Sequence, residues 1–144
     1  MTLEELHTEW EIDSQIDRTE LGIEALKIAQ LHSKYYKVYS TSRLQLRKLE
    51  ADFKILKLEK YEFYTMGPTE ETHEKGWKLP ARGAILKAEV NNYIDADPDI
   101  IKASLKIGLF QEKIQFLEDI IKSLVNRGFQ IQAAISWEKF KVGV

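Results

Sequence analysis

Residues 98–124 read PDIIKASLKIGLFQEKIQFLEDIIKSL, and their apolar side chains recur at alternating intervals of three and four. The repeating positions are Ile100, Ala103, Ile107, Phe110, Ile114, Leu117, Ile121 and Leu124. This heptad pattern gathers the apolar side chains on one stripe of an α-helix, and such a stripe packs against a second helix. The second helix can belong to the same chain or to another subunit. Asp97 and Pro98 mark the start, because an acid caps a helix N-terminus and proline suits its first position.

A second long helix is predicted upstream. Asp17 with Glu20, or Thr19, gives a start signal, and no proline follows before Pro68. At 100° per residue, one arc of about 80° in residues 27–63 is apolar. It comprises Leu31, Tyr35, Val38, Leu49, Phe53, Leu56 and Phe63. A shorter helix is predicted from about residue 3, because Thr2 and Glu5 have the spacing of a capping box.

The segment between the long helices, residues 65–83, holds two of the three prolines and three of the seven glycines without any periodicity. It predicts a long, mobile loop that joins two arms of a hairpin. Asn126-Arg127-Gly128 predicts the end of the second long helix. The chain of 144 residues fits one domain. The expected fold is therefore all-α, an antiparallel long helical hairpin with flanking shorter helices.

The sequence contains few of the residue patterns that form catalytic sites. The chain has no cysteine, and neither a phosphate-binding glycine motif nor a His-Glu-x-x-His pair occurs. Asp95, Asp97 and Asp99 imitate the opening of a calcium loop, but Ile100 and Lys106 occupy its glycine and glutamate positions. We expect no metal site, no cofactor and no enzymatic activity. No apolar run approaches the roughly 20 residues of a membrane span, and the acidic start is unlike a signal peptide, so a cytoplasmic location is expected.

Charge is distributed unevenly along the chain. Residues 1–26 contain one Arg against eight acidic residues, whereas residues 27–60 contain nine Lys and Arg against three. Opposite the apolar arc, an arc of about 40° carries a basic ridge, Tyr36, Arg43, Arg47, Lys54 and Tyr61. A solvated helix face is the ordinary explanation of such a surface. A ridge with net positive charge and flanking tyrosines also suits single-stranded nucleic acid, whose phosphates need cations and whose bases stack on aromatic rings.

Several motifs together resemble a known family. They are LHSKYY at 31–36, LKLEKYEFY at 56–64, NRGFQI at 126–131 and Ala134-Ile135-x-Trp137-x-Lys139-Phe140. Their order and spacing resemble the UvsY family of recombination mediators of T-even-type phages, from about residue 3 to the C-terminus.

The resemblance implies a ring-shaped homo-oligomer that binds single-stranded DNA in the host cell cytoplasm during infection. It also implies that the protein helps the phage recombinase (UvsX-like) displace the phage single-strand-binding protein and form a presynaptic filament. In the family, a Lys and an Arg two residues later, just before a Tyr-Tyr pair, support DNA binding. Lys57 matches the first, so the resemblance implies that it binds DNA. Glu59 stands at the second position, and we expect the nearest base, Lys60, to bind DNA in its place.

The C-terminal motif resembles the assembly region of the family. Its apolar residues make a set too large to leave in water on a small subunit. We therefore assign oligomerisation to Phe129, Ile131, Ile135, Trp137 and Phe140. The alternative function is a helical structural or scaffold subunit, in which the basic face binds an acidic region such as 1–26 of a neighbour.

Overall fold

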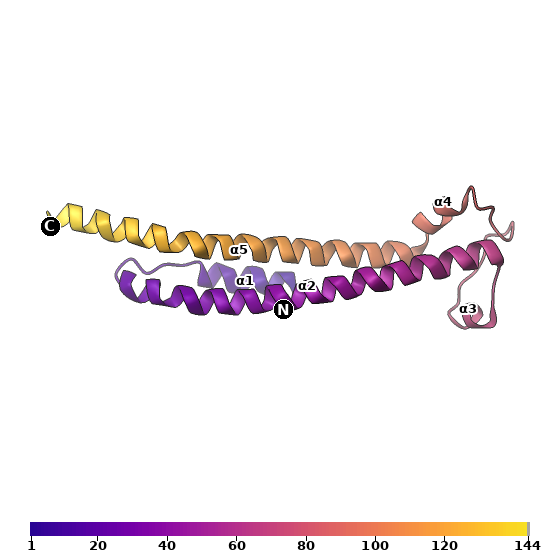
Figure 1. Cartoon of the computed structure of the whole chain (residues 1–144), viewed down its shortest axis with the longest axis horizontal. Coiled ribbons are helices and arrows are strands. Elements are labelled where there is room, and N and C mark those ends of the chain that lie inside the picture. The colour runs from indigo at the N-terminus through magenta and orange to yellow at the C-terminus, as the bar shows by residue number, and fades with distance from the viewer. Residues whose placement is uncertain (144) are drawn as a thin grey trace. The chain divides into compact units, whose positions relative to one another are not determined.

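The computed structural model describes residues 1–143, and this range contains helices and no strand (Figure 1). The helices are α1 (Leu3–Asp13), α2 (Leu21–Met66), α3 (Glu70–Glu74), α4 (Val90–Asp95) and α5 (Pro98–Val142). The all-α expectation is confirmed. The chain divides into two compact units, Met1–Leu44 with Phe110–Val144, and Gln45–Leu109. Each unit has its own hydrophobic core, and the helices α2 and α5 each contribute residues to both units.

Two helix starts agree with the sequence prediction. Thr2 Oγ1 accepts a hydrogen bond from Glu5 N at 3.2 Å, and Glu5 Oε2 accepts one from Thr2 N at 3.0 Å, which completes the capping box of α1. Asp97 Oδ1 accepts from the backbone N–H groups of Asp99 and Ile100 at 2.9 and 3.3 Å. The acid thus caps α5, and Pro98 occupies the first helical position.

The other predicted boundaries need correction. Asp17 Oδ1 accepts from Thr19 N and from its hydroxyl, forming a turn that precedes α2, which begins at Leu21. The segment 65–83, predicted to be a loop, contains helical residues, because α2 extends to Met66 and α3 lies inside the segment. The helix α4 was not predicted either.

The predicted stop at Asn126-Arg127-Gly128 is wrong, since α5 continues to Val142. Gly128 does not adopt positive φ, and a Cβ there would meet no atom within 4 Å. Arg127 is buried, and its Nη2 donates to the carbonyl oxygen of Asp13 at 3.0 Å. Ile131, one turn further, is also buried. This tertiary packing outweighs the cost of about 1 kcal/mol that a glycine imposes inside a helix.

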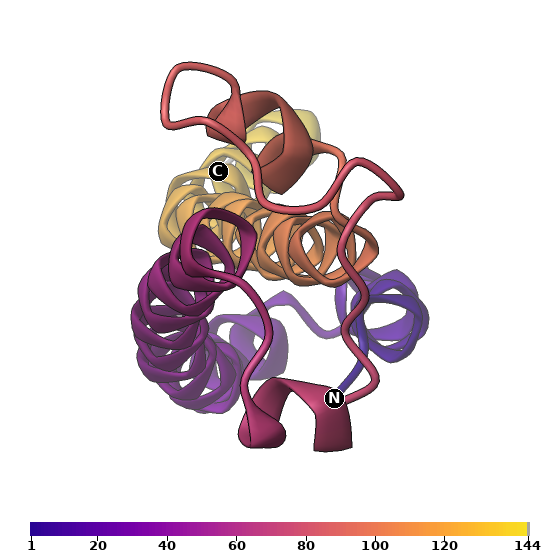
Figure 2. The same ribbon diagram turned by 90° about the vertical axis from the view of Figure 1, so that its right-hand side faces the viewer.

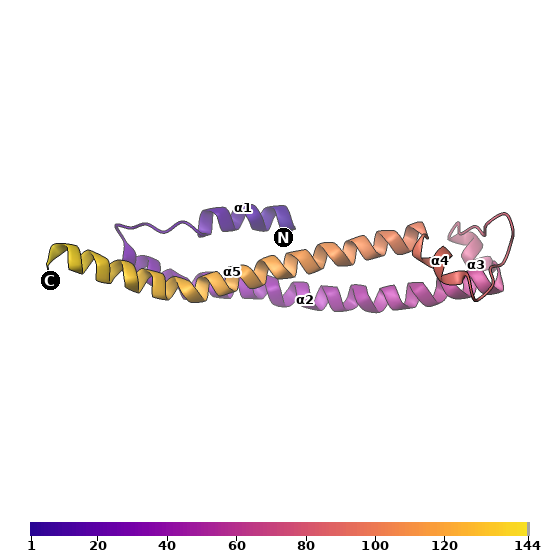
Figure 3. The same cartoon turned by 90° about the horizontal axis from the view of Figure 1, so that it is seen from above.

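The first unit packs α1 against parts of α2 and α5 (Figure 3). Its buried core consists of Leu6, Tyr35, Leu117, Ile120 and Leu124. Beside it, Asp13 Oδ2 accepts from Lys34 Nζ at 2.6 Å and from the Tyr35 hydroxyl at 2.7 Å. Burial alone would raise the pKa of Asp13, but these two hydrogen bonds and the charge of Lys34 outweigh burial and lower it. The carboxylate therefore stays ionised and joins α1 to α2.

The second unit pairs the C-terminal part of α2 with the beginning of α5, running antiparallel, and the connection with α3 and α4 closes its end (Figures 1 and 2). Its buried core consists of Phe63, Tyr64, Ile85, Val90, Ile94 and Ile100. Trp77 and Leu79, inside the predicted loop, pack against this core. The predicted apolar arc of α2 is confirmed as its inner face, because every member is buried or half-buried.

Candidate nucleic-acid interface

The first-unit members of the basic ridge are exposed. Tyr36 keeps half of its surface in solvent, and its ring stacks on His32 with centroids 5.8 Å apart and planes 10° from parallel. Arg43 lies one turn beyond Tyr39, with its guanidinium 5.4 Å from that ring. Tyr36 is therefore an exposed ring that stacks on His32, and the cation of Arg43 lies two turns away along the same helix.

The second-unit members are Arg47 and Lys54, and Lys57 lies beside them on α2. All three are exposed. The ammonium of Lys57 lies over the ring of Phe53, 5.4 Å from the ring centroid. Within residues 1–143, neither these three cations nor Arg43 forms an ion pair, whereas other lysines of the chain do. Their charges are available to a ligand.

Tyr61 differs from the other ridge residues. It is half-buried and packs against the core of the second unit. The sequence predicts Tyr61 on the outer ridge, but the structure leaves only part of its ring exposed to meet a base. The ridge therefore has an open aromatic at the Tyr36 end and a partly covered one at the other.

Lys60 is not an interface residue, which corrects the sequence interpretation. Only 2% of its surface is exposed, and its ammonium lies 3.2 Å from Asp97 Oδ2 and 2.8 Å from Asp99 Oδ2. The same ammonium lies 3.6 Å from the centroid of the Trp77 ring. A lysine so enclosed and neutralised cannot reach a phosphate without breaking the unit. Helix geometry explains the burial of Lys60, because position 60 falls on the inner arc of α2 with Phe53 and Leu56.

The Lys60 cluster includes one further hydroxyl. The Tyr64 hydroxyl donates to Asp97 Oδ2 at 2.6 Å. Burial raises the pKa of Asp97, but hydrogen bonds from Tyr64 and Lys60 outweigh burial and lower it below its ordinary value. Burial and the bond to Asp97 raise the pKa of Tyr64. The cluster joins the last turns of α2 to the N-cap of α5 by charge-assisted hydrogen bonds.

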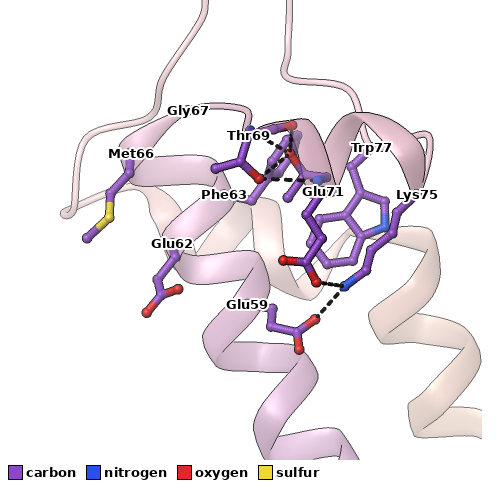
Figure 4. A pocket seen from close by; sticks show the side chains of 10 residues that line it. Glu59, Glu62, Phe63, Met66, Gly67, Thr69, Glu71, Lys75 and Trp77 are labelled. Atoms are coloured by element: carbon purple, nitrogen blue, oxygen red, sulfur yellow. Dashed lines mark hydrogen bonds and ion pairs between the residues drawn. The ribbon is translucent and has the colours of Figure 1, made fainter.

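A pocket of about 230 Å³ opens near the end of α2, between that helix and α3 (Figure 4). Lys75 Nζ bridges Glu59 Oε2 at 3.3 Å and Glu71 Oε1 at 3.6 Å, and the Trp77 ring forms one wall. Glu62 adds a third carboxylate to the lining. Three carboxylates against one ammonium make the pocket acidic, which disfavours a phosphate ligand.

The five residues assigned to oligomerisation separate into two groups. Ile131 is buried within the first unit and Ile135 is half-buried, so Ile131 is a core residue. Phe129, Trp137 and Phe140 are exposed, and the last two stack with ring centroids 5.6 Å apart. Sequence reasoning treated them as one apolar set because it expected a new segment after Gly128.

Residues 1–143 contain no group of His, Cys, Asp or Glu side chains placed to hold a metal ion. Nor does any helix in that range have a stretch long and apolar enough to cross a membrane.

The fold and the exposed cationic face define a class, an all-helical protein with a candidate surface for single-stranded nucleic acid. The chain belongs to the UvsY family: the family model described as "Recombination, repair and ssDNA binding protein UvsY" matches residues 9–144. The recombination protein uvsY of Enterobacteria phage T4 is 24% identical over 144 residues, which cover 99% of each chain.

Solved structures agree with this assignment. Two crystal structures of the bacteriophage T4 recombination mediator protein UvsY, in lattice types IV and II, superpose with TM-scores of 0.80. Their sequence identities are 23% and 25%. The match covers 98% of this chain and 99% of the first structure, and 99% and 98% for the second.

Proposed function

We propose that the chain binds single-stranded DNA through the exposed face of α2 and acts as a recombination mediator without catalysing a reaction. One observation carries this proposal: Arg43, Arg47, Lys54 and Lys57 are exposed on one helix and have no ion-pair partner within residues 1–143. Cations without a carboxylate partner can neutralise phosphates, and the counterions that the DNA releases drive binding. Tyr36 offers a flat ring on which an unstacked base can lie.

The description of the family supports the DNA ligand, because it names recombination, repair and ssDNA binding. We also propose how the chain assembles and which proteins it acts on. The chain assembles as a ring-shaped homo-oligomer in the host cytoplasm and helps a UvsX-like recombinase replace the phage single-strand-binding protein. In such a ring, many weak sites act on one strand, so assembly raises affinity through effective concentration.

Salt-titrated binding to fluorescent oligo-dT tests the DNA interface. Arg47→Ala and Lys54→Ala should each lower the slope of log K against log salt by about 0.7 for every phosphate that a subunit no longer neutralises. Lys87→Ala is the matched control, because Lys87 is an exposed cation outside α2 and α5. Equal slopes for all three variants would contradict the interface. Negligible affinity of the unmodified chain at low salt would favour the scaffold alternative.

Tyr36→Ala should behave differently from the cation variants. Loss of stacking costs roughly 1–3 kcal/mol per base and leaves the salt slope nearly unchanged. The mediator role needs a separate assay, in which the recombinase assembles on DNA already coated by the single-strand-binding protein. The chain should shorten the lag before filament growth, and an Arg47→Ala/Lys54→Ala variant should not. An equal lag with and without the chain would refute the mediator role.

A further inference from the structure

A groove of about 210 Å³ lies between α2 and α5 in the second unit, next to the exposed cations of the candidate interface. Phe53 and Lys57 of α2 form one wall. The groove is smaller than the pockets of about 300–1,000 Å³ that hold drug-sized ligands, so it suits a small planar group. The remaining lining residues come from the end of α4 and the first turns of α5, and they are Asp95, Ile100, Ile101, Ser104 and Leu105.

Lys57 belongs both to this groove and to the exposed cations of α2. At 100° per residue, Lys57 lies about 60° around the helix from Lys54, and Phe53 lies about 40° further in the same direction. The helix surface therefore leads from the basic ridge, past Lys57, into the groove. The arc of about 80° from Arg47 to Lys57 contains one exposed carboxylate, Glu50, so its net charge is positive. A single-stranded DNA whose phosphates follow these cations brings its bases to the mouth of the groove.

Inside the groove, the polar lining disfavours phosphate and favours a base. The Asp95 carboxylate is exposed, and in the described part of the chain it forms no ion pair with Lys57. A carboxylate repels phosphate but accepts hydrogen bonds, and aspartate is a known acceptor for the N4 amino group of cytosine. The Ser104 hydroxyl can donate to a ring nitrogen or a carbonyl of the same base. The two side chains together suit a base edge that carries an amino group.

The apolar lining suits the faces of a base. Ile101 and Leu105 are 44% and 69% exposed, and the half-buried ring of Phe53 lies beneath the ammonium of Lys57. A base that lies against these side chains removes their apolar surface from water. A basic side chain of a partner protein could pair with Asp95, but the charge of Lys57 at the same groove opposes a second cation. A neutral base is therefore the better occupant.

We propose that this groove binds one unstacked cytosine, with Lys57 at the adjoining phosphate and Asp95 at the N4 amino group. This rests on the proposed function, because the DNA must first follow the exposed face of α2. Thymine carries a carbonyl oxygen where cytosine carries the amino group, so it would turn an acceptor toward the carboxylate. The chain should therefore bind oligo-dC more tightly than oligo-dT.

Fluorescence anisotropy with short oligo-dC and oligo-dT of equal length tests the groove, at a mildly alkaline pH that keeps both unpaired. The unmodified chain should bind oligo-dC about tenfold more tightly, which is the effect of one charge-assisted hydrogen bond. Asp95→Asn should abolish this ratio, because the amide can also donate to the thymine carbonyl. Asp52→Asn is the matched control. It removes an exposed carboxylate of α2 outside the groove, so it should shift both affinities alike and keep the ratio.

Two further readouts locate the base. Ser104→Leu fills the groove from an exposed position and should lower the oligo-dC affinity to that of oligo-dT without changing the salt slope. Ser123→Leu makes the same change at an exposed position of α5 in the first unit and should alter neither affinity. Circular dichroism checks that both variants keep their helices. Photocrosslinking with 5-iododeoxycytidine should attach the base to the peptide that contains Phe53.

Four results would each overturn the proposal: equal affinities of the unmodified chain for the two oligonucleotides, a ratio that Asp95→Asn leaves unchanged, full oligo-dC affinity of Ser104→Leu, or crosslinks confined to other segments. The salt slopes of Arg47→Ala and Lys54→Ala separate this failure from failure of the proposed function. Lowered slopes together with equal affinities would keep the DNA interface and remove the groove from it. Unchanged slopes would refute the interface on α2 itself.

Discussion

Replacing Lys60 by alanine should destabilise the second unit strongly and barely change the DNA contact. The substitution leaves Asp97, only 4% exposed, without the ammonium 3.2 Å away, and removes a cation from the face of Trp77. Breaking a buried ion pair by removing one partner costs about 3–5 kcal/mol. The bond to Asp99 adds little, because that carboxylate is half exposed. Lys60→Met should cost about as much, since it restores the volume and leaves the carboxylate unpaired.

Urea unfolding monitored by tryptophan fluorescence and circular dichroism measures this destabilisation. With a slope of about 1–3 kcal/mol per molar urea, the midpoint should fall by about 1–5 M. Lys54→Ala is the matched control on the same helix, because Lys54 is exposed and should change stability by no more than about 0.5 kcal/mol. The oligo-dT salt slope of folded Lys60→Ala should equal that of the unmodified chain. An unchanged midpoint together with a lower slope would refute the structural role and return Lys60 to the interface.

Three further outcomes are expected. Asp97 has a lowered pKa, so its contribution to stability is present above the ordinary carboxyl pKa near 4 and disappears as the pH falls through the folded value. Asp97→Asn should therefore flatten the decline of thermal stability below that ordinary pKa. Ile131→Ala should cost about 2–5 kcal/mol of unfolding free energy, because Ile131 is a core residue. Trp137→Ser with Phe140→Ser should weaken self-association and leave urea unfolding of the subunit nearly unchanged. The reverse pattern would contradict the assignment of Ile131 to the core and of Trp137 and Phe140 to the exposed group. Gly128→Ala should raise the melting temperature by stabilising a helix interior by about 1 kcal/mol, and a lower melting temperature would show that the glycine is needed as a helix stop after all.

Periodicity was sufficient to predict the parts of the fold that depend on one helix at a time. The apolar arc of α2 and the Asp97 cap follow from local spacing, and the structure contains both. The stop at Gly128 failed because Arg127 and Ile131 continue α5 through contacts with residues distant in sequence. Short helix α4 has no strong periodic signal, and the buried Val90 and Ile94 become visible only once the core is assembled.

The candidate interface was predictable to a similar extent. Exposure of Arg43, Arg47 and Lys54 follows from the helical wheel, since they lie opposite the buried arc. Lys60 shares the inner arc with Phe53, and that position could have indicated its burial. The carboxylates that neutralise it are 37 and 39 residues away and follow a connection whose path no local pattern gives.

The contacts that hold the connection between α2 and α5 in place also indicate where the family can vary in length and where the protein can be labelled. Ile85 N donates to the Tyr64 carbonyl at 2.8 Å, and Lys60 is bound to the N-cap of α5, so both ends of this segment are fixed independently of its tip. Lengthening a loop whose ends are already fixed costs only about 0.6 kcal/mol for each doubling. Insertions at the exposed residues 86–88 should therefore be tolerated, and a fluorophore or affinity tag placed there would report on the protein from outside the basic ridge.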